Sequence, residues 1–307
     1  MNIEVLLTEA EIAQEFAEAL EARDLPEKFF YWLPLSVKTW QDLSAQENFR
    51  SLDSAWDLVN SKAAELVAGF GTAVPLVSLG AGEGHKDRAL LKALQRAGKT
   101  VKYFPVDASQ TLLEIACAAA EDDDLEVLGI KADISSPMHM VLASDAAESP
   151  KLLVMSGNTL GAFDPLDQIR HIAETMKSGD RLVLDAEIFR ENAPEDDQPK
   201  LTKFAMAPLA SLGIHEDDGQ IRFETKSDER HAGMQMTAKY FQAHRDLRIA
   251  ITGREVSIAR GERIFMNFRY RFTPAAFHWL LKEHAGLKME MEFVSADGNF
   301  IVAVCSS

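Results

Sequence analysis

The sequence predicts an α/β protein in which helices cover both faces of a mainly parallel sheet. Three observations lead to this fold class. Short apolar runs alternate with helical patterns over residues 74–184, a glycine-rich turn follows the first of these runs, and an Asp-Gly turn joins the last two apolar runs. Alternation of this kind specifies parallel strands, because each crossover must pack its helix back on the sheet.

The length and composition exclude several classes of protein. A chain of 307 residues with 47% hydrophobic and 26% charged residues is neither a disordered regulator nor a small disulfide scaffold. Its net charge of -16 repels phosphate backbones and anionic lipid, so we expect no nucleic-acid and no membrane partner. Two distant cysteines, Cys117 and Cys305, and the lack of a secretory or membrane-spanning segment predict a cytoplasmic protein.

The first seventy residues are expected to be mostly helical. Apolar residues recur at helical spacing over 8–23, with Thr8 as N-cap and Glu11 completing a capping box. A second helical pattern covers 51–67 and ends at Gly69 and Gly71.

The middle of the chain supplies the parallel sheet, and the C-terminal third changes character. Strands are predicted at 74–79, 101–106, 126–130, 152–155 and 181–184, with helices at 86–96, 109–120, 137–143 and 165–176. A helix at 194–212 then precedes an antiparallel meander with strands at 221–225, 234–243, 254–259 and 263–272. A helix at 274–284 and a hairpin of 287–294 with 299–304 around Ala296-Asp297-Gly298 complete the chain.

The glycine-rich turn is the most informative segment. Gly80-Ala81-Gly82-Glu83-Gly84 follows the first strand of the sheet, where glycines let a ligand approach the main chain beside the positive end of the next helix. The remaining glycine of the dinucleotide fingerprint and a second mononucleotide half are missing, which favours a single adenosyl ligand over NAD. No Lys-Ser or Lys-Thr follows the glycines, which excludes a P-loop.

Acidic residues follow the next two strands at the same edge of the sheet. Asp107 lies about twenty residues beyond the glycine turn, where an acid accepts hydrogen bonds from ribose hydroxyls. It is alternatively the N-cap of the next helix, a role that Ser109 fills equally well. Asp133 is placed to accept from an adenine amino group, or else caps the helix at Pro137.

Other chemistry receives little support from the sequence. His278 and His284 are six residues apart and share no helix face, and His215-Glu216 lacks the second histidine of a zincin helix, so no metal site is expected. The Gly-x-Ser-x-Gly nucleophile elbow is absent. Asp185 and Glu187 at the tip of the fifth strand either orient a nucleophilic amine or cap the following segment.

Several segments in order resemble one known family. They are Leu-Gly-Ala-Gly-Glu-Gly-His-Lys at 79–86, Pro-Val-Asp-Ala-Ser at 105–109, Asp-Ile at 133–134, Gly-Asn-Thr-Leu-Gly at 157–161, Ser-Gly-Asp-Arg-Leu at 178–182 and, more loosely, Gly-Glu at 261–262 and Arg-Phe-Thr-Pro at 271–274. The chain resembles the histidine-specific family of S-adenosylmethionine-dependent methyltransferases, which includes an enzyme of ergothioneine biosynthesis.

The resemblance implies a fold, a cofactor and a set of cofactor residues. The fold is a Rossmann-like class I methyltransferase domain at 61–190 and 286–307, whose parallel sheet ends in an antiparallel hairpin, with an α+β accessory domain at 1–60 and 191–285. The cofactor is S-adenosyl-L-methionine, with its methionine part near Gly80, Gly82 and Lys86, its ribose at Asp107 and its adenine at Asp133. The full cofactor set is Gly80, Ala81, Gly82, Lys86, Asp107, Ala108, Asp133, Ile134, Ser156 and Gly157.

The substrate positions depart from the family pattern. The asparagine with which the histidine enzyme grips its amino acid corresponds to Ala162, and its acidic and hydroxyl pair corresponds to Asn267 and Arg269. The family's tyrosine has no clear partner between 189 and 204. We therefore expect a small-molecule methyl acceptor, an amino acid or amine methylated at nitrogen, that is not free histidine. The predicted substrate-binding residues are Asn158, Phe163, Asn267 and Arg269.

Several questions stay open at this point. Arg269 alternates with apolar residues, so it either faces the pocket or belongs to a solvated sheet face with Arg263 and Arg271. The aromatic run 29–32 is either a lid over the cofactor or a core anchor. The alternative functions are an inactive S-adenosylmethionine-binding module and, more weakly, an NAD-dependent oxidoreductase. No catalytic residue is assigned, and a monomer or weak homo-oligomer is expected.

The charge is unevenly distributed along the chain. Residues 221–290 hold 13 Lys and Arg against 8 Asp and Glu, although the whole chain holds 32 against 48. The predicted accessory meander is thus mildly basic and suited to a small acidic acceptor, whereas the acidity lies in the remainder.

Overall fold

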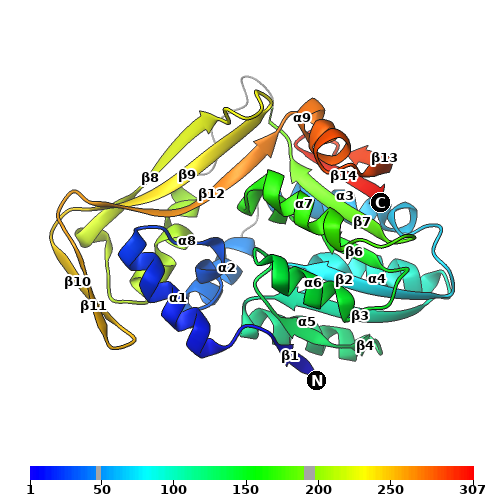
Figure 1. The fold of residues 1–307 in the computed structure, drawn as a ribbon, viewed down its shortest axis with the longest axis horizontal. Helices are drawn as coiled ribbons and strands as arrows, with labels where there is room; N and C mark the ends of the chain where they lie inside the picture. The colour runs from blue at the N-terminus through cyan, green and yellow to red at the C-terminus, as the bar shows by residue number, and fades with distance from the viewer. Residues whose placement is uncertain (46–49, 190–197) are drawn as a thin grey trace.

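The computed structural model describes residues 1–45, 50–189 and 198–307, and it contains a large sheet beside a smaller one (Figure 1). The large sheet has nine strands, namely β1 (Ile3–Val5), β2 (Ala73–Leu79), β3 (Thr100–Asp107), β4 (Glu126–Val127), β5 (Gly129–Lys131), β6 (Leu152–Met155), β7 (Arg181–Glu187), β13 (Lys288–Val294) and β14 (Phe300–Ser306). Their order is β1-β5-β3-β2-β6-β7-β14-β13, with β4 beside β3. Strands β1 to β7 pair in parallel, and β14 pairs antiparallel with β7 and with β13. The predicted parallel sheet with an antiparallel end is confirmed.

Helices cover both faces of this sheet (Figure 1). They are α3 (Arg50–Leu66), α4 (His85–Arg96), α5 (Gln110–Asp122), α6 (Pro137–Asp145), α7 (Pro165–Thr175) and α9 (Pro274–Trp279), the last continued by a π-helical turn, η4 (Leu280–His284). One core cluster packs α3 and α4 against the sheet, and another packs α6, α7 and α9. Neighbouring strand residues alternate between them, as Val302 and Ala303 do, because successive side chains point to opposite faces.

The smaller part combines helices with antiparallel strands. Strands β8 (Gly219–Ser227), β9 (Met234–Ala243) and β12 (Arg263–Phe272) form a sheet in the order β12-β9-β8, and β10 (Leu247–Ile251) pairs with β11 (Arg254–Ile258) in a separate hairpin. They pack with α1 (Glu9–Ala22), the 3-10 turn η1 (Glu27–Phe30), α2 (Pro34–Ser44) and α8 (Gln198–Ala210) in a core of their own. A second 3-10 turn, η3 (Glu216–Asp218), precedes β8.

Several predicted boundaries agree with the structure. Helix α1 has the predicted capping box, in which the amide of Glu11 donates to Thr8 Oγ1 at 3.2 Å and the amide of Thr8 donates to Glu11 Oε2 at 2.8 Å. Helix α3 matches the pattern at 51–67. The helix expected at 194–212 matches α8, although its first four residues lie outside the described part.

Three elements are absent from the sequence-based prediction. Helix α2 begins at Pro34, in a segment where the sequence predicted no helix. Strand β10 pairs with β11 across Thr252 and Gly253, both with positive φ, a turn without the usual Asn-Gly signal. Strand β1 has only three residues, too few for periodicity to be visible.

Strand β1 and helix α9 also change the predicted partition of the chain. Both segments were expected in the accessory domain, yet β1 pairs with β5 of the large sheet and Phe277 of α9 is buried in the core of that sheet. Gly129 explains the close approach of β1, because a Cβ there would lie 2.7 Å from Cys117 Sγ and 3.0 Å from Ile3. None of the helices in the described segments is long and apolar enough to cross a membrane.

Candidate active site

The glycine turn after β2 is folded against the tip of β3. Gly80, Gly82 and Gly84 have φ values of 74°, 56° and 74°, a conformation that side chains other than glycine rarely adopt. The amides of Gly80 and Ala81 donate to the carbonyl of Val106 at 2.9 and 3.0 Å. A Cβ built on Gly82 would meet no heavy atom within 4 Å, so this turn presents open space to a ligand.

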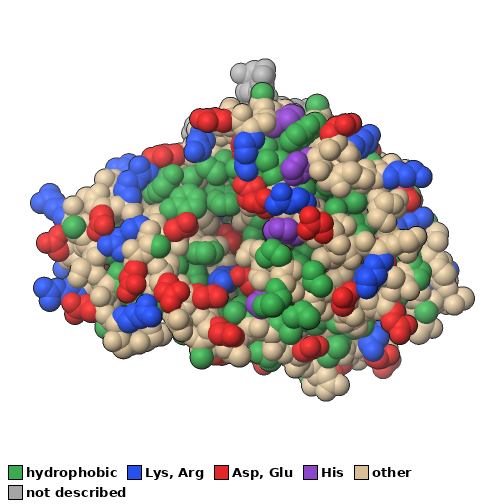
Figure 2. Space-filling view, in the orientation of Figure 1, with side chains coloured by type: hydrophobic (Ala, Val, Ile, Leu, Met, Phe, Trp, Pro, Cys, Tyr) green, Lys and Arg blue, Asp and Glu red, His purple; other side chains and the backbone are tan. Residues whose placement is uncertain are grey.

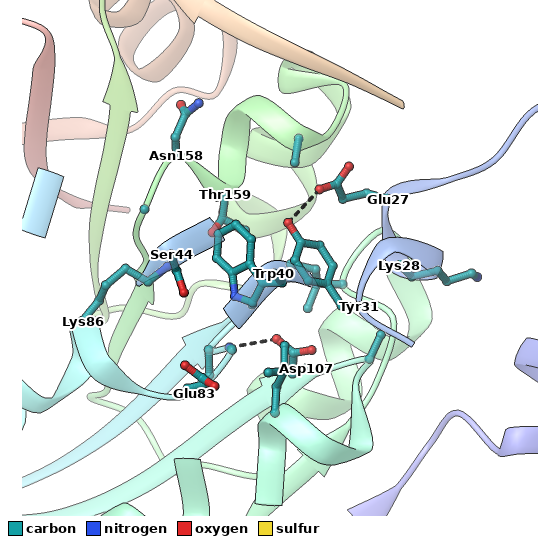
Figure 3. A pocket seen from close by; sticks show the side chains of 18 of the residues that line it. Glu27, Lys28, Tyr31, Trp40, Ser44, Glu83, Lys86, Asp107, Asn158 and Thr159 are labelled. Atoms are coloured by element: carbon teal, nitrogen blue, oxygen red, sulfur yellow. Dashed lines mark hydrogen bonds between the residues drawn. The ribbon is translucent and has the colours of Figure 1, made fainter. Parts of the chain in front are cut away.

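Asp107 lies at the tip of β3 and fixes the glycine turn. Its Oδ2 accepts from the amide of Gly82 at 2.8 Å and its Oδ1 accepts from the amide of Ser109 at 2.9 Å (Figure 3). Ser109 is the N-cap of α5, so Asp107 is free of the capping role. Burial raises the pKa of Asp107, although the amides of Ser109 and Gly82 and the charge of Lys86 oppose that shift.

Asp133 follows β5 and already has a cationic partner. It accepts from the amide of Ser135 at 2.9 Å and from its hydroxyl at 2.6 Å, while Ser136 caps α6. Lys28 of η1 places its ammonium 2.6 Å from Asp133 Oδ2. Burial alone would raise the pKa of Asp133, but the charge of Lys28 and these hydrogen bonds lower it. Lys28 was not predicted as a site residue.

A turn after β6 completes this edge of the sheet. Lys86 Nζ donates to the carbonyl of Ser156 at 2.5 Å. The fully buried Asp185 accepts from the Ser156 hydroxyl at 2.6 Å and from the amides of Gly157 and Asn158 at 2.7 and 2.6 Å. Asp185 therefore holds the turn after β6 in place. Neither of the two interpretations of Asp185 from the sequence included this role.

A cavity opens along these strand tips. All the predicted cofactor residues except Ser156 line it, and so do Asn158 and Phe163. Its opposite wall comes from the N-terminal segment and α3, with Glu27, Lys28, Tyr31, Trp40, Ser44 and Trp56. Figure 3 shows the rings of Tyr31 and Trp40 between Asp107 on one side and Glu27 on the other. On the face shown in Figure 2, apolar, acidic and basic side chains meet around a central hollow.

The aromatic run 29–32 divides between the core and the cavity. Phe29 and Phe30 are buried in the accessory core. The rings of Tyr31 and Trp40 meet edge to face with centroids 5.4 Å apart, and both pack on Phe204 of α8. Two residues of the run thus anchor the N-terminal helices while Tyr31 forms a cavity wall; closure as a lid stays a prediction.

A second cavity adjoins the first and extends toward the small sheet. Its lining includes Lys239, Phe268 and Arg269 from that sheet and Leu201 and Phe204 from α8. The two cavities share part of their walls, formed by Glu27, Tyr31, Trp40, Gly157, Asn158 and Ala162.

A β-bulge in β12 decides which arginines face this second cavity. The register of β12 against β9 shifts between Phe265 and Asn267, which reverses the side to which odd-numbered residues point. The side chain of Arg269 is 16% exposed and pairs with Glu187, whereas that of Arg263 is 41% exposed and pairs with Glu224. The alternative of one solvated face for all three arginines is therefore wrong.

Asn267 contacts the cavity wall through Glu27, a residue that the sequence analysis above did not single out. Its Nδ2 donates to Glu27 Oε2 at 2.6 Å, and the Tyr31 hydroxyl donates to Glu27 Oε1 at 3.0 Å. Asn267 itself is absent from the lining of both cavities, contrary to the expectation that it binds substrate directly. Burial raises the pKa of Glu27 despite the nearby charge of Lys239 and these two donors. Glu27 sits in a short turn without periodicity or motif, so no sequence signal marks it.

Metal binding receives no support within residues 1–45, 50–189 and 198–307. No group of three or more His, Cys, Asp or Glu side chains there is arranged to hold an ion.

Comparison with known proteins places the chain in one family. The family model described as "Histidine-specific methyltransferase, SAM-dependent" matches residues 9–307. The histidine N-alpha-methyltransferase of Mycolicibacterium smegmatis is 26% identical over 294 residues, covering 91% of this chain and 88% of that protein. The 4-dimethylallyltryptophan N-methyltransferase easF of Epichloe festucae var. lolii is 26% identical over 171 residues, covering 52% and 49%. The N-methyltransferase fsqC of Aspergillus fumigatus is 23% identical over 256 residues, covering 80% and 69%.

The family match extends over both parts of the fold, from α1 to the last strand. It agrees with a parallel sheet whose strand tips carry the glycine turn and two acids around one cavity. This chain belongs to the histidine-specific family of S-adenosylmethionine-dependent methyltransferases.

Proposed function

We propose that this protein transfers the methyl group of S-adenosylmethionine to a nitrogen of a small amino acid or amine other than free histidine. The observation that carries the proposal is the pair of cavities that share a wall at Gly157, Asn158 and Ala162. One cavity holds the predicted cofactor residues, and the other offers polar and aromatic side chains to an acceptor. The three relatives named above are all N-methyltransferases with differing acceptors in their names, which supports nitrogen as the acceptor atom.

The residues along the strand tips fit the cofactor. The open space beside Gly82 leaves room for it, and Lys86 and Gly157 close the same end of the cavity. We expect Asp107 to accept from ribose hydroxyls and Asp133 to accept from an adenine amino group. When bound, the cofactor supplies a methyl group on a positively charged sulfur. Methyl transfer is a direct displacement, so the protein contributes mainly by aligning acceptor and donor.

Arg269 indicates what else the acceptor carries. Its guanidinium contacts Glu187, but its Nε is buried with no hydrogen-bond acceptor in the part of the chain that the structure describes. A buried donor without a partner is costly, and a guanidinium suits a carboxylate. An acceptor with a carboxylate, such as an amino acid, would satisfy Arg269.

The same positions argue against free histidine. Ala162 stands where the family's asparagine grips the amino acid, and Arg269 introduces a cation where the family has a hydroxyl that reads the imidazole. A guanidinium has donors only and repels a protonated imidazole. These changes also motivate the alternative, a catalytically inactive protein that binds S-adenosylmethionine as a module for partner recognition.

An acceptor screen separates the two functions. The purified protein is incubated with methyl-labelled S-adenosylmethionine and a panel of amino acids and amines, and methylated products are identified by mass spectrometry. We expect transfer to at least one amine and none to histidine, with Asp107→Ala losing the activity. Tight cofactor binding without any product across the panel would favour the binding module, and efficient methylation of histidine would refute the proposed specificity.

A further inference from the structure

We propose that Glu27 binds the ammonium group of the methyl acceptor and thereby selects acceptors that carry an amine. This inference rests on the proposed function, since it concerns the acceptor of that reaction. Glu27 belongs to the N-terminal segment. It lies neither at the strand tips nor on β12, the strand whose residues Asn267 and Arg269 the resemblance implies as substrate contacts.

Glu27 lies where the two cavities meet. It lies in the wall that the two cavities share, together with Tyr31 and Asn158. The other acids that line the first cavity, Glu83, Asp107 and Asp133, do not line the second. Within the described residues, Glu27 is therefore the carboxylate located where the cofactor side meets the acceptor side.

Two side chains from different segments hold the Glu27 carboxylate. Asn267 of β12 and Tyr31 of the N-terminal segment each donate one hydrogen bond to a different carboxylate oxygen. Asn267 stands where the resemblance expects an acid that contacts the substrate. The chain thus keeps a carboxylate next to that position but supplies it from a residue 240 positions away in the sequence.

The cluster of Glu27, Tyr31 and Asn267 contains a hydrogen-bond acceptor that has no donor within the described part of the chain. Asn267 is 3% exposed, and its Oδ1 has no hydrogen-bond donor among the residues that the structure describes. Glu27 is half-buried, and its two hydrogen bonds come from neutral groups, with the charge of Lys239 nearby. An ammonium has three donors, no acceptor and a positive charge, so it complements the Glu27 carboxylate, which lines both cavities.

The surrounding side chains define the rest of the acceptor. Tyr31, Trp40, Phe204 and Phe268 give the second cavity an aromatic lining, and Arg269 adds a cation within the same lining. An ammonium at Glu27 and a carboxylate at Arg269 correspond to an amino acid, and the aromatic walls favour an aromatic side chain. Aromatic L-amino acids are accordingly the probes with which to test Glu27.

The test compares each probe with its deamino analogue, such as L-tryptophan with indole-3-propionate and L-phenylalanine with 3-phenylpropionate. Binding is measured calorimetrically in the presence of S-adenosylhomocysteine for the wild type, Glu27→Gln, Glu27→Asp and the control Glu18→Gln, an exposed acid of α1. Gln keeps the shape and removes the charge. Asp keeps the charge, and its shorter side chain is expected to restore part of the binding.

We expect the wild type to bind at least one amino acid about 10-fold or more tightly than its deamino analogue. Glu27→Gln should abolish that preference by weakening the amino acid alone, while Glu18→Gln behaves as the wild type. If Glu27→Gln weakens both members of a pair equally, or if the preference survives in it, Glu27 has only a structural role and the inference is overturned. A wild type that prefers no amine over its deamino analogue overturns it as well.

The proposed function can fail separately. If amines bind through Glu27 but no labelled methyl group is transferred, the protein is a binding module and the role of Glu27 stands. If transfer occurs and Glu27→Gln leaves the KM of the acceptor unchanged, the methyltransferase stands and the role of Glu27 is refuted.

Discussion

The proposed cofactor side and the proposed acceptor side of the cavity are built in different ways. On the cofactor side, Gly82, Asp107 and Asp133 each follow a strand of the parallel sheet within a few residues, and main-chain amides hold Asp107. On the acceptor side, Glu27 and Arg269 come from segments far apart in the chain and are held by side chains. Backbone geometry thus fixes one side, whereas the other depends on contacts between side chains.

We expect this difference to underlie the departures from the family pattern at the substrate positions. A side chain that is held by the main chain of a strand tip keeps its place when its neighbours change. A pair such as Glu27 and Asn267 depends on both side chains at once, so charge can move from one segment to another without altering the fold. The acceptor side is therefore where members of the family are expected to diverge.

Gly157 belongs to both sides, so we expect the largest effect from Gly157→Ala. Its φ of 83° disfavours any side chain, and a Cβ would collide with the ammonium end of Lys86. Strain of this kind costs about 1–3 kcal/mol, and displacement of Lys86 should weaken S-adenosylhomocysteine binding about 100-fold, by analogy with other charge-assisted contacts. Thermal unfolding and calorimetric titration measure the two effects.

Gly71→Ala is the matched control for Gly157→Ala. No heavy atom lies within 4 Å of a Cβ at this exposed glycine, so stability should change by no more than about 0.5 kcal/mol and cofactor affinity should stay constant. Equal effects from the two substitutions would show that Gly157 is not special to the site.

Arg269→Ala should separate the two sides. We expect the KM of a carboxylate-bearing acceptor to rise about 10- to 100-fold through loss of a buried charge-assisted contact, with little change in cofactor affinity. Arg263→Ala, on the same strand but at the surface, should leave both unchanged. A loss of cofactor affinity in Arg269→Ala comparable to the rise in KM would contradict the division of the cavity.

Lys28→Met tests the ion pair that joins the N-terminal segment to the strand tips. Removing Lys28 leaves the buried Asp133 without its cation, so the free energy of unfolding should fall by about 2–4 kcal/mol near pH 7. The exposed pair of Lys38 with Asp42 offers the control Lys38→Met, whose expected cost is about 0.5 kcal/mol or less.

The effect of Lys28→Met should depend on pH in a definite direction. The pKa of Asp133 is lowered, so its contribution is present above the unfolded value of about 3.9 and is lost as the pH falls below it. The pKa of Lys28 is raised, so its contribution is present below about 10.4 and is lost at higher pH. Urea unfolding at pH 7 and pH 3 should show a large difference from the wild type at the first pH and a small one at the second.

Asp228→Asn should have the smallest effect. Asp228 accepts from Arg230 and from the Tyr270 hydroxyl, and these hydrogen bonds lower the pKa of Asp228 to about 2. Its contribution is present above about pH 4 and is lost as the pH falls toward 2, so we expect a loss of about 1–2 kcal/mol at pH 7. Since Asp228 lines neither cavity, a change in cofactor affinity would show that the network also shapes the site.

The sequence predicted well which residues gather at the strand tips, because the signals that mark them are local. A glycine turn or an acid after a strand is visible within ten residues, and the parallel topology brings such residues to one edge. Glu27 and Lys28 could not be predicted in this way, because their partners Asn267 and Asp133 lie far away in the chain. The bulge that turns Arg269 inward is a feature of strand pairing, so simple alternation could not decide between the two orientations that the sequence left open. Helix α2 and strands β1 and β10 were missed because their patterns are short.

Titration with S-adenosylhomocysteine, followed by calorimetry, tests the central claim most directly. The claim is that the cofactor binds at the strand tips through Asp107 and independently of the acceptor side. We predict binding by the wild type, a loss of about 10-fold or more in Asp107→Ala, and wild-type affinity in Arg269→Ala and in Asp122→Ala, an exposed acid of α5 that serves as control. A wild type that does not bind, or an Asp107→Ala variant that binds as the wild type does, would contradict the account.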